Sequence, residues 1–532
     1  MVIARILVPA LLAGCVIDKE AYEDARAALA DEDGDGVPLA GGDCDDGDAT
    51  RYPGAAEVYY DGVDQDCAGD DDYDADGDGD LPTELGGADC DDADASVSGL
   101  AVEGWQDAGI DNDCDGSIDD QVLVSLSDIA TRVPGAAAGD ALGSALRRLP
   151  AGWISDEEVL LAGAPLGAGG GRIYGWPASG LGEGVTVESA SWTRDGAEGD
   201  YLGFGLGWGG DAASPVTFAG AEGADGGRGA VLAWIGTDWG SEPSFALVGA
   251  VDQAYLGLTV LAGQDLDGDG VADLVAAAPL DRSVANSAGS VYILLDPPYY
   301  EGTVSAEDAD LRVITPYAGA LLTPQPVGDL DEDGLPDLGL TQSLSAEDGP
   351  GALLLTDLRE LGTVEADDAA QAQVIGGPMI FGEAWDADGD GRTDLHGASG
   401  GLYRFELPLS GTVTPWEDAV ESLPFADPDD TFAALRTDSP GYAGRARMVN
   451  TAKTWRSGAG LLSVDVPTWR GQRLADDAQF LAAGDAPGDH AGAAVELLDL
   501  EGDGLVDIVV GAPDADPAGS GSGAIYLVPA PR

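Results

Sequence analysis

The sequence is poor in histidine, methionine and basic residues. Its 532 residues include two histidines, three methionines and 23 lysines and arginines, against 98 aspartates and glutamates. The formal charge of −75 would repel phosphate groups, so we expect no nucleic-acid partner. His396 and His490 lie in different parts of the chain. A zinc enzyme usually needs several nitrogen or sulfur ligands, so this composition disfavours one.

The N terminus has no apolar segment long enough to span a bilayer as a helix. Residues 1–14 are apolar apart from Arg5, and they end in Leu12-Ala13-Gly14 followed by Cys15. This segment resembles a bacterial lipoprotein signal peptide, which implies cleavage before Cys15 and lipidation of that residue. The resemblance predicts an exported lipoprotein of the outer membrane or cell surface of a Gram-negative bacterium. The alternative is an ordinary apolar N terminus with a chance cysteine.

Cysteine is also scarce, and its distribution is informative. Apart from Cys15 there are four cysteines, two in each of two similar acidic modules, residues 31–71 and 72–120. Residues 15–30 would form a tether in front of them. An even number of cysteines in an exported, loop-rich segment favours disulfides, and zinc binding would require CxxC or histidine spacing that is missing. The predicted pairs are Cys44 with Cys67 and Cys90 with Cys114.

The two modules are too acidic to fold unaided. Residues 31–120 contain 31 aspartates and glutamates and one base, Arg51. Unpaired carboxylates at this density repel one another and would leave a disordered spacer, whereas bound cations would allow the segment to fold. The repeated DGDG and DCDD sequences resemble the acidic cysteine-containing repeats of the MopE type. The modules contain no histidine or methionine, so they suit Ca²⁺ better than copper. The expected ligands are Asp31, Asp33, Asp35, Asp74, Asp76 and Asp78.

Four acidic loops recur after residue 121, each between two apolar segments with strand character. Carboxylates at loop positions 1, 3, 5 and 9, with the backbone carbonyl of position 7, can converge on one hard cation such as Ca²⁺. A residue other than glutamate at position 12 argues against an EF-hand. The alternative is a set of acidic surface turns that bind nothing. The expected ligands are Asp265, Asp267, Asp269, Val271 and Asp273; Asp329, Asp331, Asp333, Leu335 and Asp337; Asp386, Asp388, Asp390, Arg392 and Asp394; and Asp499, Glu501, Asp503, Leu505 and Asp507.

A glycine followed by an alternating apolar strand recurs seven times in residues 121–532. It begins at Gly171, Gly229, Gly289, Gly351, Gly401, Gly460 and Gly523. Each unit of about sixty residues has room for four short strands, which predicts an all-β, seven-bladed β-propeller. The order Leu-Gly, acidic loop and Gly-Ala-Pro resembles the FG-GAP repeats of integrin α-subunits. We expect the segment Val122–Leu126 to complete the seventh blade beside the last strands and so close the ring.

Three classes of function fit these features: a calcium-dependent binding or adhesion scaffold, a structural envelope protein without a discrete ligand, and a hydrolase acting on glycans or lipids. We favour the scaffold, which would be a monomer that binds a protein or glycan at the cell surface and contacts the membrane through its lipid anchor only. Carboxylates are too abundant to nominate a glycosidase pair. Some FG-GAP proteins are phospholipases, but their metal-site histidines have no counterpart here. We therefore expect no enzymatic activity.

The calcium hypothesis predicts the thermal behaviour of residues 16–532. Four or more Ca²⁺ should bind, and chelation should lower the melting temperature strongly, because unshielded carboxylates would then repel one another. Calorimetry with and without chelator, combined with a metal analysis, would test this. Melting that ignores the chelator, with no bound metal, would mean that the acidic loops are solvated turns.

Overall fold

The computed structural model describes two compact units. Residues up to 118, except 104–109, form the N-terminal unit, and the remaining residues form the second unit. The described residues are 29–68, 73–99, 114 and 123–529, except 183, 238, 240–241, 262, 345–348, 357, 359–361, 376–377, 383–392, 399–400, 420, 425–431, 443–444, 453–460, 466–479 and 501–506. No described helix is long and apolar enough to cross a membrane.

The described part of the N-terminal unit consists mainly of turns. Its regular elements are two 3-10 helices, η1 (Leu39–Gly41) and η2 (Thr83–Leu85), each ended by a glycine in the left-handed region. Cys44 pairs with Cys67 and Cys90 with Cys114, with Cα–Cα distances of 5.7 Å in both cases. The predicted disulfide pairing is therefore confirmed.

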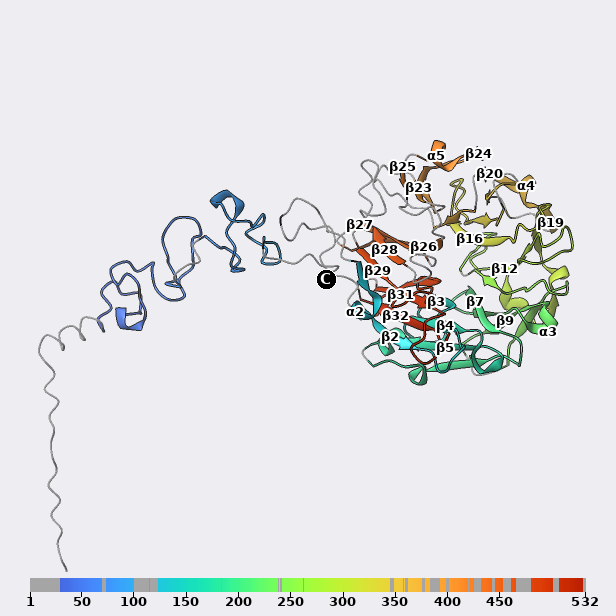
Figure 1. The fold of residues 1–532 in the computed structure, drawn as a ribbon, viewed down its shortest axis with the longest axis horizontal. Helices are drawn as coiled ribbons and strands as arrows, with labels where there is room; N and C mark the ends of the chain where they lie inside the picture. Colours follow the sequence, from blue (N-terminus) through green and yellow to red (C-terminus); the bar gives the residue numbers. More distant parts are fainter. Residues whose placement is uncertain are drawn as a thin grey trace, which may run out of the picture. The chain divides into compact units, whose positions relative to one another are not determined.

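The second unit is all-β, and its strands form seven sheets around a ring (Figure 1). The first three sheets in chain order are β3 (Ala145–Leu149), β4 (Val159–Ala164), β5 (Arg172–Pro177) and β6 (Trp192–Asp195); β7 (Leu202–Gly210), β8 (Pro215–Ala221), β9 (Ala230–Ile235), β10 (Phe245–Val248) and β14 (Gly302–Ser305); and β11 (Thr259–Val260), β12 (Leu274–Ala278), β13 (Ser290–Leu294), β15 (Leu311–Ile314) and β19 (Gly362–Glu365).

The remaining four sheets follow the same plan. They are β16 (Thr323–Gly328), β17 (Asp337–Thr341), β18 (Ala352–Leu355), β20 (Ala370–Val374) and β24 (Gly411–Val413); β21 (Ile380–Phe381), β22 (Asp394–Ala398), β23 (Gly401–Glu406) and β25 (Glu421–Pro424); β26 (Phe432–Tyr442), β27 (Arg445–Ala452), β28 (Leu461–Asp465), β29 (Phe480–Ala483) and β1 (Leu123–Ser125); and β30 (Ala494–Leu498), β31 (Asp507–Ala512), β32 (Ala524–Val528) and β2 (Thr131–Pro134).

The seven glycine-led strands predicted from the sequence lie in seven different sheets, third in each. Contacts join most of the first strands of successive sheets, namely β3 with β7, β7 with β11, β16 with β21, β21 with β26 and β26 with β30. The third and fourth sheets meet through β12 and β16, and β30 also contacts β3. The expectation of an all-β propeller is therefore confirmed. The count of seven blades assigns one blade to each sheet. This count stays a prediction.

Short helices mark the passage from one sheet to the next. Four sheets carry a fifth strand that pairs in parallel with their outer strand, and a short helix follows each fifth strand. These helices are α2 (Leu126–Ile129), η8 (Ala306–Asp308), α4 (Ala366–Ala369) and α5 (Pro415–Asp418). The chain then enters the outer strand of another sheet, so each connection ties two sheets together. The other short helices are η4 (Gly167–Gly169), η5 (Ala178–Gly180), η6 (Val187–Ser189), α3 (Ala224–Gly227) and η7 (Pro297–Tyr299).

The hydrophobic core lies between neighbouring sheets. Every residue of β4 is buried, as is every residue of β31, so these second strands are covered on both faces. One cluster combines Leu160 and Trp176 of the first sheet with Val509 and Ile525 of the last. Strands covered on both faces read as continuous apolar runs. The core therefore joins the first and last parts of the second unit.

Glycine pairs allow the backbones of adjacent sheets to touch. A Cβ atom added to Gly163 would lie 1.9 Å from the carbonyl oxygen of Gly203, which no side chain could tolerate. Gly163 belongs to the Gly-Ala-Pro sequence of one unit and Gly203 to the Leu-Gly pair of the next. The same contact recurs in two further pairs, Gly220 with Gly257 (1.8 Å) and Gly511 with Gly143 (2.1 Å). The last pair joins the final unit to the first.

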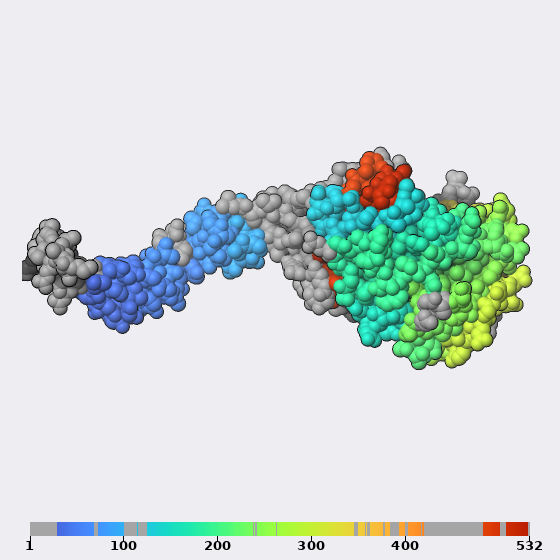
Figure 2. Space-filling model, turned by 90° about the horizontal axis from the view of Figure 1, so that it is seen from below, coloured from blue at the N-terminus to red at the C-terminus, as the bar shows by residue number. Residues whose placement is uncertain are grey.

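The strand that completes the last sheet differs from the predicted one. Residues Leu123–Ser125 form β1, which pairs in parallel with β29 of the preceding sheet. It is β2, residues Thr131–Pro134, that pairs antiparallel with β32 and completes the last sheet. The prediction that Val122–Leu126 completes the last sheet was therefore wrong, because this segment pairs with the preceding sheet. The segment β1-α2-β2 has the same arrangement as the other connections between sheets: a fifth strand, a short helix and then the outer strand of another sheet. The sequence analysis did not predict this arrangement. In Figure 2 the last strands, in red, lie against the first strands, in cyan.

Asp485 holds this N-terminal segment in place. Its carboxylate accepts hydrogen bonds from the Ser125 hydroxyl (2.7 Å), the Ser127 amide (3.1 Å) and the Tyr526 hydroxyl (2.9 Å). It also pairs with Arg132 at 3.1 Å. Burial raises the pKa of Asp485, but the hydrogen bonds outweigh it and hold the pKa below its usual value. The carboxylate therefore joins β1, α2 and β2 to the last sheet.

We expect Asp485→Ala to destabilise the second unit by about 2–4 kcal/mol, because several donors would lose a charged acceptor. Urea unfolding at neutral pH would measure the loss. Asp128→Ala, which removes an exposed carboxylate of α2, should change the stability by less than about 0.5 kcal/mol. Equal stability of the two variants would contradict this account of closure.

Candidate metal centres

The first acidic loop connects β11 to β12 and has a defined conformation. Asp265 accepts hydrogen bonds from the amides of Gly268 (2.8 Å) and Gly270 (2.9 Å). Asp269 accepts one from Val271 (2.8 Å). These bonds fold the loop so that one oxygen from each of Asp265, Asp267 and Asp269 lies within 4.8 Å of the others. This spacing is what three ligands of one cation at 2.3–2.6 Å would show.

The second loop, between β16 and β17, repeats this conformation. Asp329 accepts hydrogen bonds from the amides of Asp333 (3.1 Å) and Gly334 (2.8 Å), and Asp333 accepts one from Leu335 (2.9 Å). Oxygens of Asp329, Asp331 and Asp333 again lie within 4.8 Å of one another. Two loops of different surrounding sequence thus present the same three carboxylates.

The position 9 aspartate anchors each loop to its strand. Asp273, Asp337 and Asp507 are buried, and each accepts a hydrogen bond from the amide of loop position 2, at 2.8, 2.7 and 2.6 Å respectively. In the third loop, buried Asp394 pairs with buried Arg404 at 3.0 Å. This arginine would reduce the charge available to a cation there.

Parts of the third and fourth loops lie outside the described residues. Of the predicted ligands in these loops, only Asp394, Asp499 and Asp507 are described. The ligands that the structure does not describe are Asp386, Asp388, Asp390, Arg392, Glu501, Asp503 and Leu505. All ligand assignments, including the carbonyls of Val271 and Leu335, stay predictions.

The charge of the first loop is poorly compensated by protein groups. Burial raises the pKa of Asp273 to about 7, and the charges of Asp267 and Asp265 add to the effect. Asp296 follows β13, and its carboxylate contacts that of Asp269. Burial and this contact raise the pKa of Asp296 to about 6. Its Oδ1 is buried and accepts no hydrogen bond from a described residue. Sequence reasoning missed Asp296, because it lies 23 residues after Asp273.

The N-terminal modules contain the same loop. Asp31 accepts hydrogen bonds from the amides of Gly34 (2.7 Å) and Gly36 (3.1 Å), and Asp74 accepts them from Gly77 (2.8 Å) and Gly79 (2.9 Å). The oxygens of each triad again lie within 4.8 Å of one another; the triads are Asp31, Asp33 and Asp35, and Asp74, Asp76 and Asp78. The predicted carboxylates are therefore brought together in both modules.

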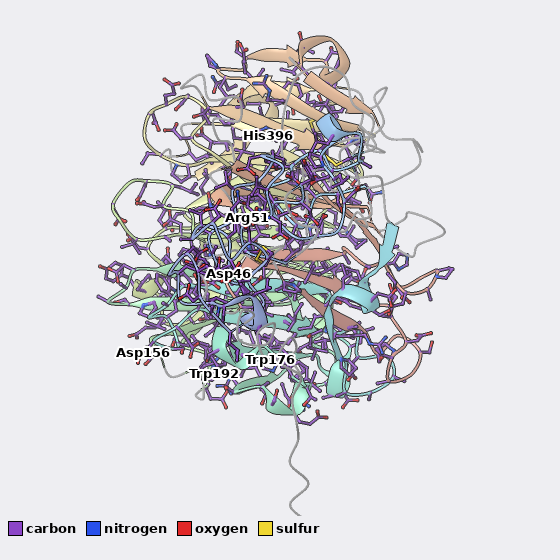
Figure 3. All side chains as sticks on the ribbon, turned by 90° about the vertical axis from the view of Figure 1, so that its left-hand side faces the viewer. Asp46, Arg51, Asp156, Trp176, Trp192 and His396 are labelled. Atoms are coloured by element: carbon purple, nitrogen blue, oxygen red, sulfur yellow. A yellow bond between two sulfur atoms is a disulfide. The ribbon has the colours of Figure 1, made fainter. Side chains whose placement is uncertain are left out.

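A further triad was not predicted. Oxygens of Glu57, Asp64 and Asp66 converge within 4.8 Å in the first module. Glu57 accepts hydrogen bonds from the amides of Gln65 (2.9 Å) and Asp66 (3.0 Å). The proximity of residues on both sides of a loop, rather than a regular spacing, creates this group. Arg51, the single base of the modules, pairs with Asp45 at 3.0 Å and donates to the carbonyl of Asp64. Its side chain is labelled in Figure 3.

The donor groups fit a hard metal ion. The convergent atoms are carboxylate oxygens, and several are buried without a hydrogen-bond donor among the described residues. A bound cation would offset the cost of burying these charges. Copper sites favour imidazole or sulfur ligands, and the described triads contain neither.

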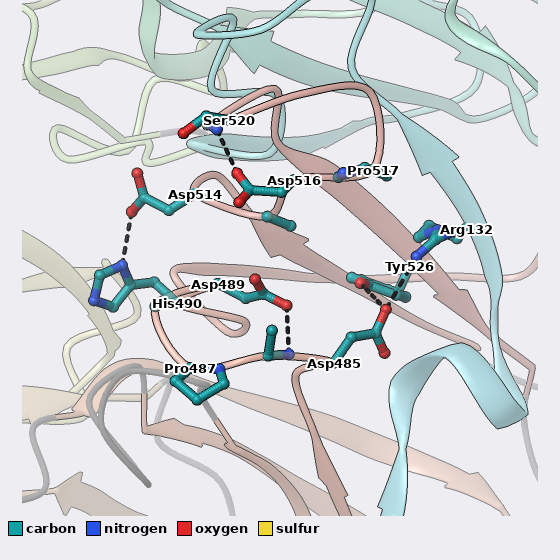
Figure 4. A pocket seen from close by; sticks show the side chains of 14 residues that line it. Arg132, Asp485, Pro487, Asp489, His490, Asp514, Asp516, Pro517, Ser520 and Tyr526 are labelled. Carbon is teal, nitrogen blue, oxygen red and sulfur yellow. Dashed lines mark hydrogen bonds and ion pairs between the residues drawn. The ribbon is translucent and has the colours of Figure 1, made fainter.

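A cavity of about 590 Å³ lies beside the last sheet (Figure 4). Its lining includes Asp485, Asp489 and His490, and the Nδ1 atom of His490 lies 2.7 Å from Asp514. His490 has a φ of 50°, as Ala141, Tyr201 and Tyr255 have φ values of 56–57° before the Leu-Gly pairs of other units. Among the described residues, no hydroxyl or thiol is hydrogen-bonded to the other ring nitrogen of His490. The histidine thus occupies a recurring turn position.

Comparisons with known proteins agree with the two kinds of acidic site, those of the N-terminal modules and those between the strands of the second unit. The family model of the Cu-binding MopE metal-binding motif matches residues 43–73 and 89–120. The FG-GAP repeat model matches residues 256–294 and 491–528. Parts of the chain thus match a metal-binding motif and FG-GAP repeats, and the second unit is similar to integrin α-subunits. The disulfides and this likeness indicate an exported or extracellular protein.

Two integrin subunits are among the similar proteins. Human (Homo sapiens) integrin alpha-IIb is 31% identical over 158 residues, which cover 27% of this chain and 14% of the integrin. The mouse (Mus musculus) protein is 29% identical over 193 residues, covering 32% of this chain and 18% of the integrin. The chain therefore spans less than a fifth of these relatives. The BBS1N complex with ARL6DN, soaked with lead, contains a chain with a TM-score of 0.39 and 12% identity; the match covers 75% of this chain and 96% of that one.

Asp273 predicts a pH dependence of the metal-free protein. Its folded pKa of about 7 lies above the unfolded value of about 3.9. The folded state therefore holds this proton more tightly, and its stability should fall as pH rises from about 4 to about 7, by about 1.4 kcal/mol per pH unit at most. Asp273→Asn should remove this part of the slope, measured by thermal unfolding in chelator.

The matched control for this prediction is Asp308→Asn, which changes an exposed carboxylate of η8 and should keep the wild-type slope. With Ca²⁺ at neutral pH, Asp273→Asn should lose one bound ion and melt at a lower temperature than the wild type. An unchanged slope and an unchanged metal content would count against a role of Asp273 in the centre.

Proposed function

We propose that this protein is an exported, calcium-binding scaffold that presents a β-propeller to a protein or glycan ligand at the cell surface. The observation that carries the proposal is the repeated convergence of three carboxylates in both units. The FG-GAP repeats and the similarity to integrin alpha-IIb support a binding role rather than a catalytic one. The ligand is bound by the second unit, and the cations stabilise the loops that connect its strands.

Calcium fits these centres better than other common cations. The ligands are oxygens on loops held by backbone hydrogen bonds, and Ca²⁺ accepts such irregular oxygen sets more readily than Mg²⁺ does. Sites in extracellular modules bind Ca²⁺ at about 10⁻⁴–10⁻³ M. The ions therefore act in stability rather than in signalling.

Two finer features complete the proposal. Each of the seven sheets forms one blade, which the contacts between successive sheets and between β30 and β3 support. The monomer is attached to the outer membrane or cell surface through a lipid on Cys15, which lies outside the described residues. Mass spectrometry of membrane-extracted protein would detect this lipid, and its absence with an intact N terminus would contradict the attachment.

A glycan and cell-binding array tests the binding function. The purified protein should bind a defined subset of array positions in 1 mM Ca²⁺ and lose most of this binding in chelator, because the loops between strands would lose their order. The double variant Asp265→Asn, Asp329→Asn should bind more weakly, and Asp308→Asn should bind as the wild type does. Binding that is equal with and without Ca²⁺ would contradict the calcium-dependent scaffold, and hydrolysis of array glycans would indicate an enzyme.

A further inference from the structure

Two buried aspartates outside the predicted loops stand out in the N-terminal unit. Asp43 is 3% exposed and Asp89 is 1% exposed, although both modules are small and rich in turns. Each lies one residue before a cysteine of a disulfide. A carboxylate buried to this extent needs a partner, because desolvation of an isolated charge is costly. Asp43 and Asp89 therefore each need a group that compensates the buried charge.

Protein donors satisfy one oxygen of each carboxylate. The Oδ1 atom of Asp43 accepts the amide of Asp45, and that of Asp89 accepts the amide of Asp91, both at 2.8 Å. The Oδ2 atoms are buried and accept no hydrogen bond from any described residue. The same holds for the Oδ2 atoms of two acids in each neighbouring loop, namely Asp33 and Asp35, and Asp76 and Asp78. Three corresponding carboxylate oxygens are therefore unsatisfied in both modules, and the first module has two more, on Glu57 and Asp64.

The backbone brings these acids to the loops. In the second module, Pro82 and Asp89 form an isolated bridge, and the amide of Asp89 donates to the carbonyl of Leu81 at 3.1 Å. The Ala75 amide, at position 2 of the loop, donates to Asp92 at 3.4 Å. In the first module the corresponding amide of Glu32 donates to Asp46 at 3.3 Å. The segment that contains the cysteine is thus attached to the loop in both modules.

The charges of the two segments act on each other. Burial raises the pKa of Asp33, and the charges of Asp35 and Asp43 add to this effect. In the second module, burial and the charges of Asp78 and Asp89 raise the pKa of Asp76. The single base of the modules, Arg51, pairs with Asp45, and no ion pair joins a base to these acids among the described residues. A divalent cation between each loop and the neighbouring buried aspartate would compensate these charges.

We propose that Asp43 and Asp89 each supply the ligand that closes a Ca²⁺ site begun by the preceding DxDxD loop. One ion then joins the loop of Asp31 to the segment of Cys44, and a second joins the loop of Asp74 to the segment of Cys90. Both loops lie outside residues 43–73 and 89–120, which match the MopE motif. The functional module therefore begins before the matched motif. This inference rests on the assignment of Ca²⁺ in the proposed function.

Calcium binding by full-length variants tests the proposal. Asp43→Asn and Asp89→Asn remove one charge each and keep an Oδ1 that can accept the same amide. Each variant should weaken one site at least about tenfold and bind one Ca²⁺ fewer near the wild-type dissociation constant, and the double variant should bind two fewer. Equilibrium dialysis with metal analysis would count the ions. Glu32→Gln, which changes an exposed acid within the first loop, should bind as the wild type does.

Hydrogen exchange of residues 31–44 distinguishes a role of Asp43 as a Ca²⁺ ligand from a purely structural role. Ca²⁺ should slow exchange in the wild type and in Glu32→Gln but not in Asp43→Asn. In chelator, Asp43→Asn should exchange no faster than the wild type, because it removes a repelling charge. Wild-type Ca²⁺ affinity in both variants would overturn the inference while leaving the proposed function intact. If Ca²⁺ does not slow exchange in the wild type and the whole protein binds none, the proposed function fails as well.

Discussion

The propeller depends on the close approach of glycine backbones between neighbouring sheets. Gly163 lies against Gly203, and Gly511 lies against Gly143, so closely that a single methyl group would prevent the contact. These are the glycines of the Gly-Ala-Pro and Leu-Gly sequences. The two sequences thus act as the two halves of one contact between consecutive units. Where the third unit has alanine at Ala277, the next unit has Leu322-Thr323 in place of Leu-Gly, so both halves change together.

A second constraint is negative charge, which the chain concentrates instead of dispersing. The loops use backbone amides to orient their carboxylates, as the paired amides on Asp265 and on Asp31 illustrate. Amides can hold one oxygen of each acid, but they leave others buried without a donor among the described residues. The same loop conformation, with backbone amides that orient the carboxylates, occurs in a hairpin loop within a sheet. It also occurs in a module that has no strand of its own among the described residues. The loop is thus independent of the fold around it.

Local patterns in the sequence predicted most of the fold. The glycine-led strands, the disulfide pairs and the carboxylate triads each depend on residues close in the chain, and the structure has the strands, both disulfides and the four predicted triads that lie wholly within the described residues. The sequence did not predict the partner of β1 or the role of Asp485, because both depend on residues more than 350 positions away. Asp43, Asp89 and Asp296 were not predicted as site residues for a related reason: burial, rather than spacing, distinguishes them from the many other acids.

The position of β2 sets an order for folding. The last sheet takes three strands from the C-terminal end of the chain and one from residues 131–134, so it cannot form until nearly the whole chain has been synthesised or exported. Each disulfide, by contrast, spans only 23 or 24 residues and can form as soon as its own module has emerged. The N-terminal modules can therefore be complete before the propeller closes. The strand β2 stays without its antiparallel partner β32 until the C-terminal end of the chain is available, so the ring closes late in folding.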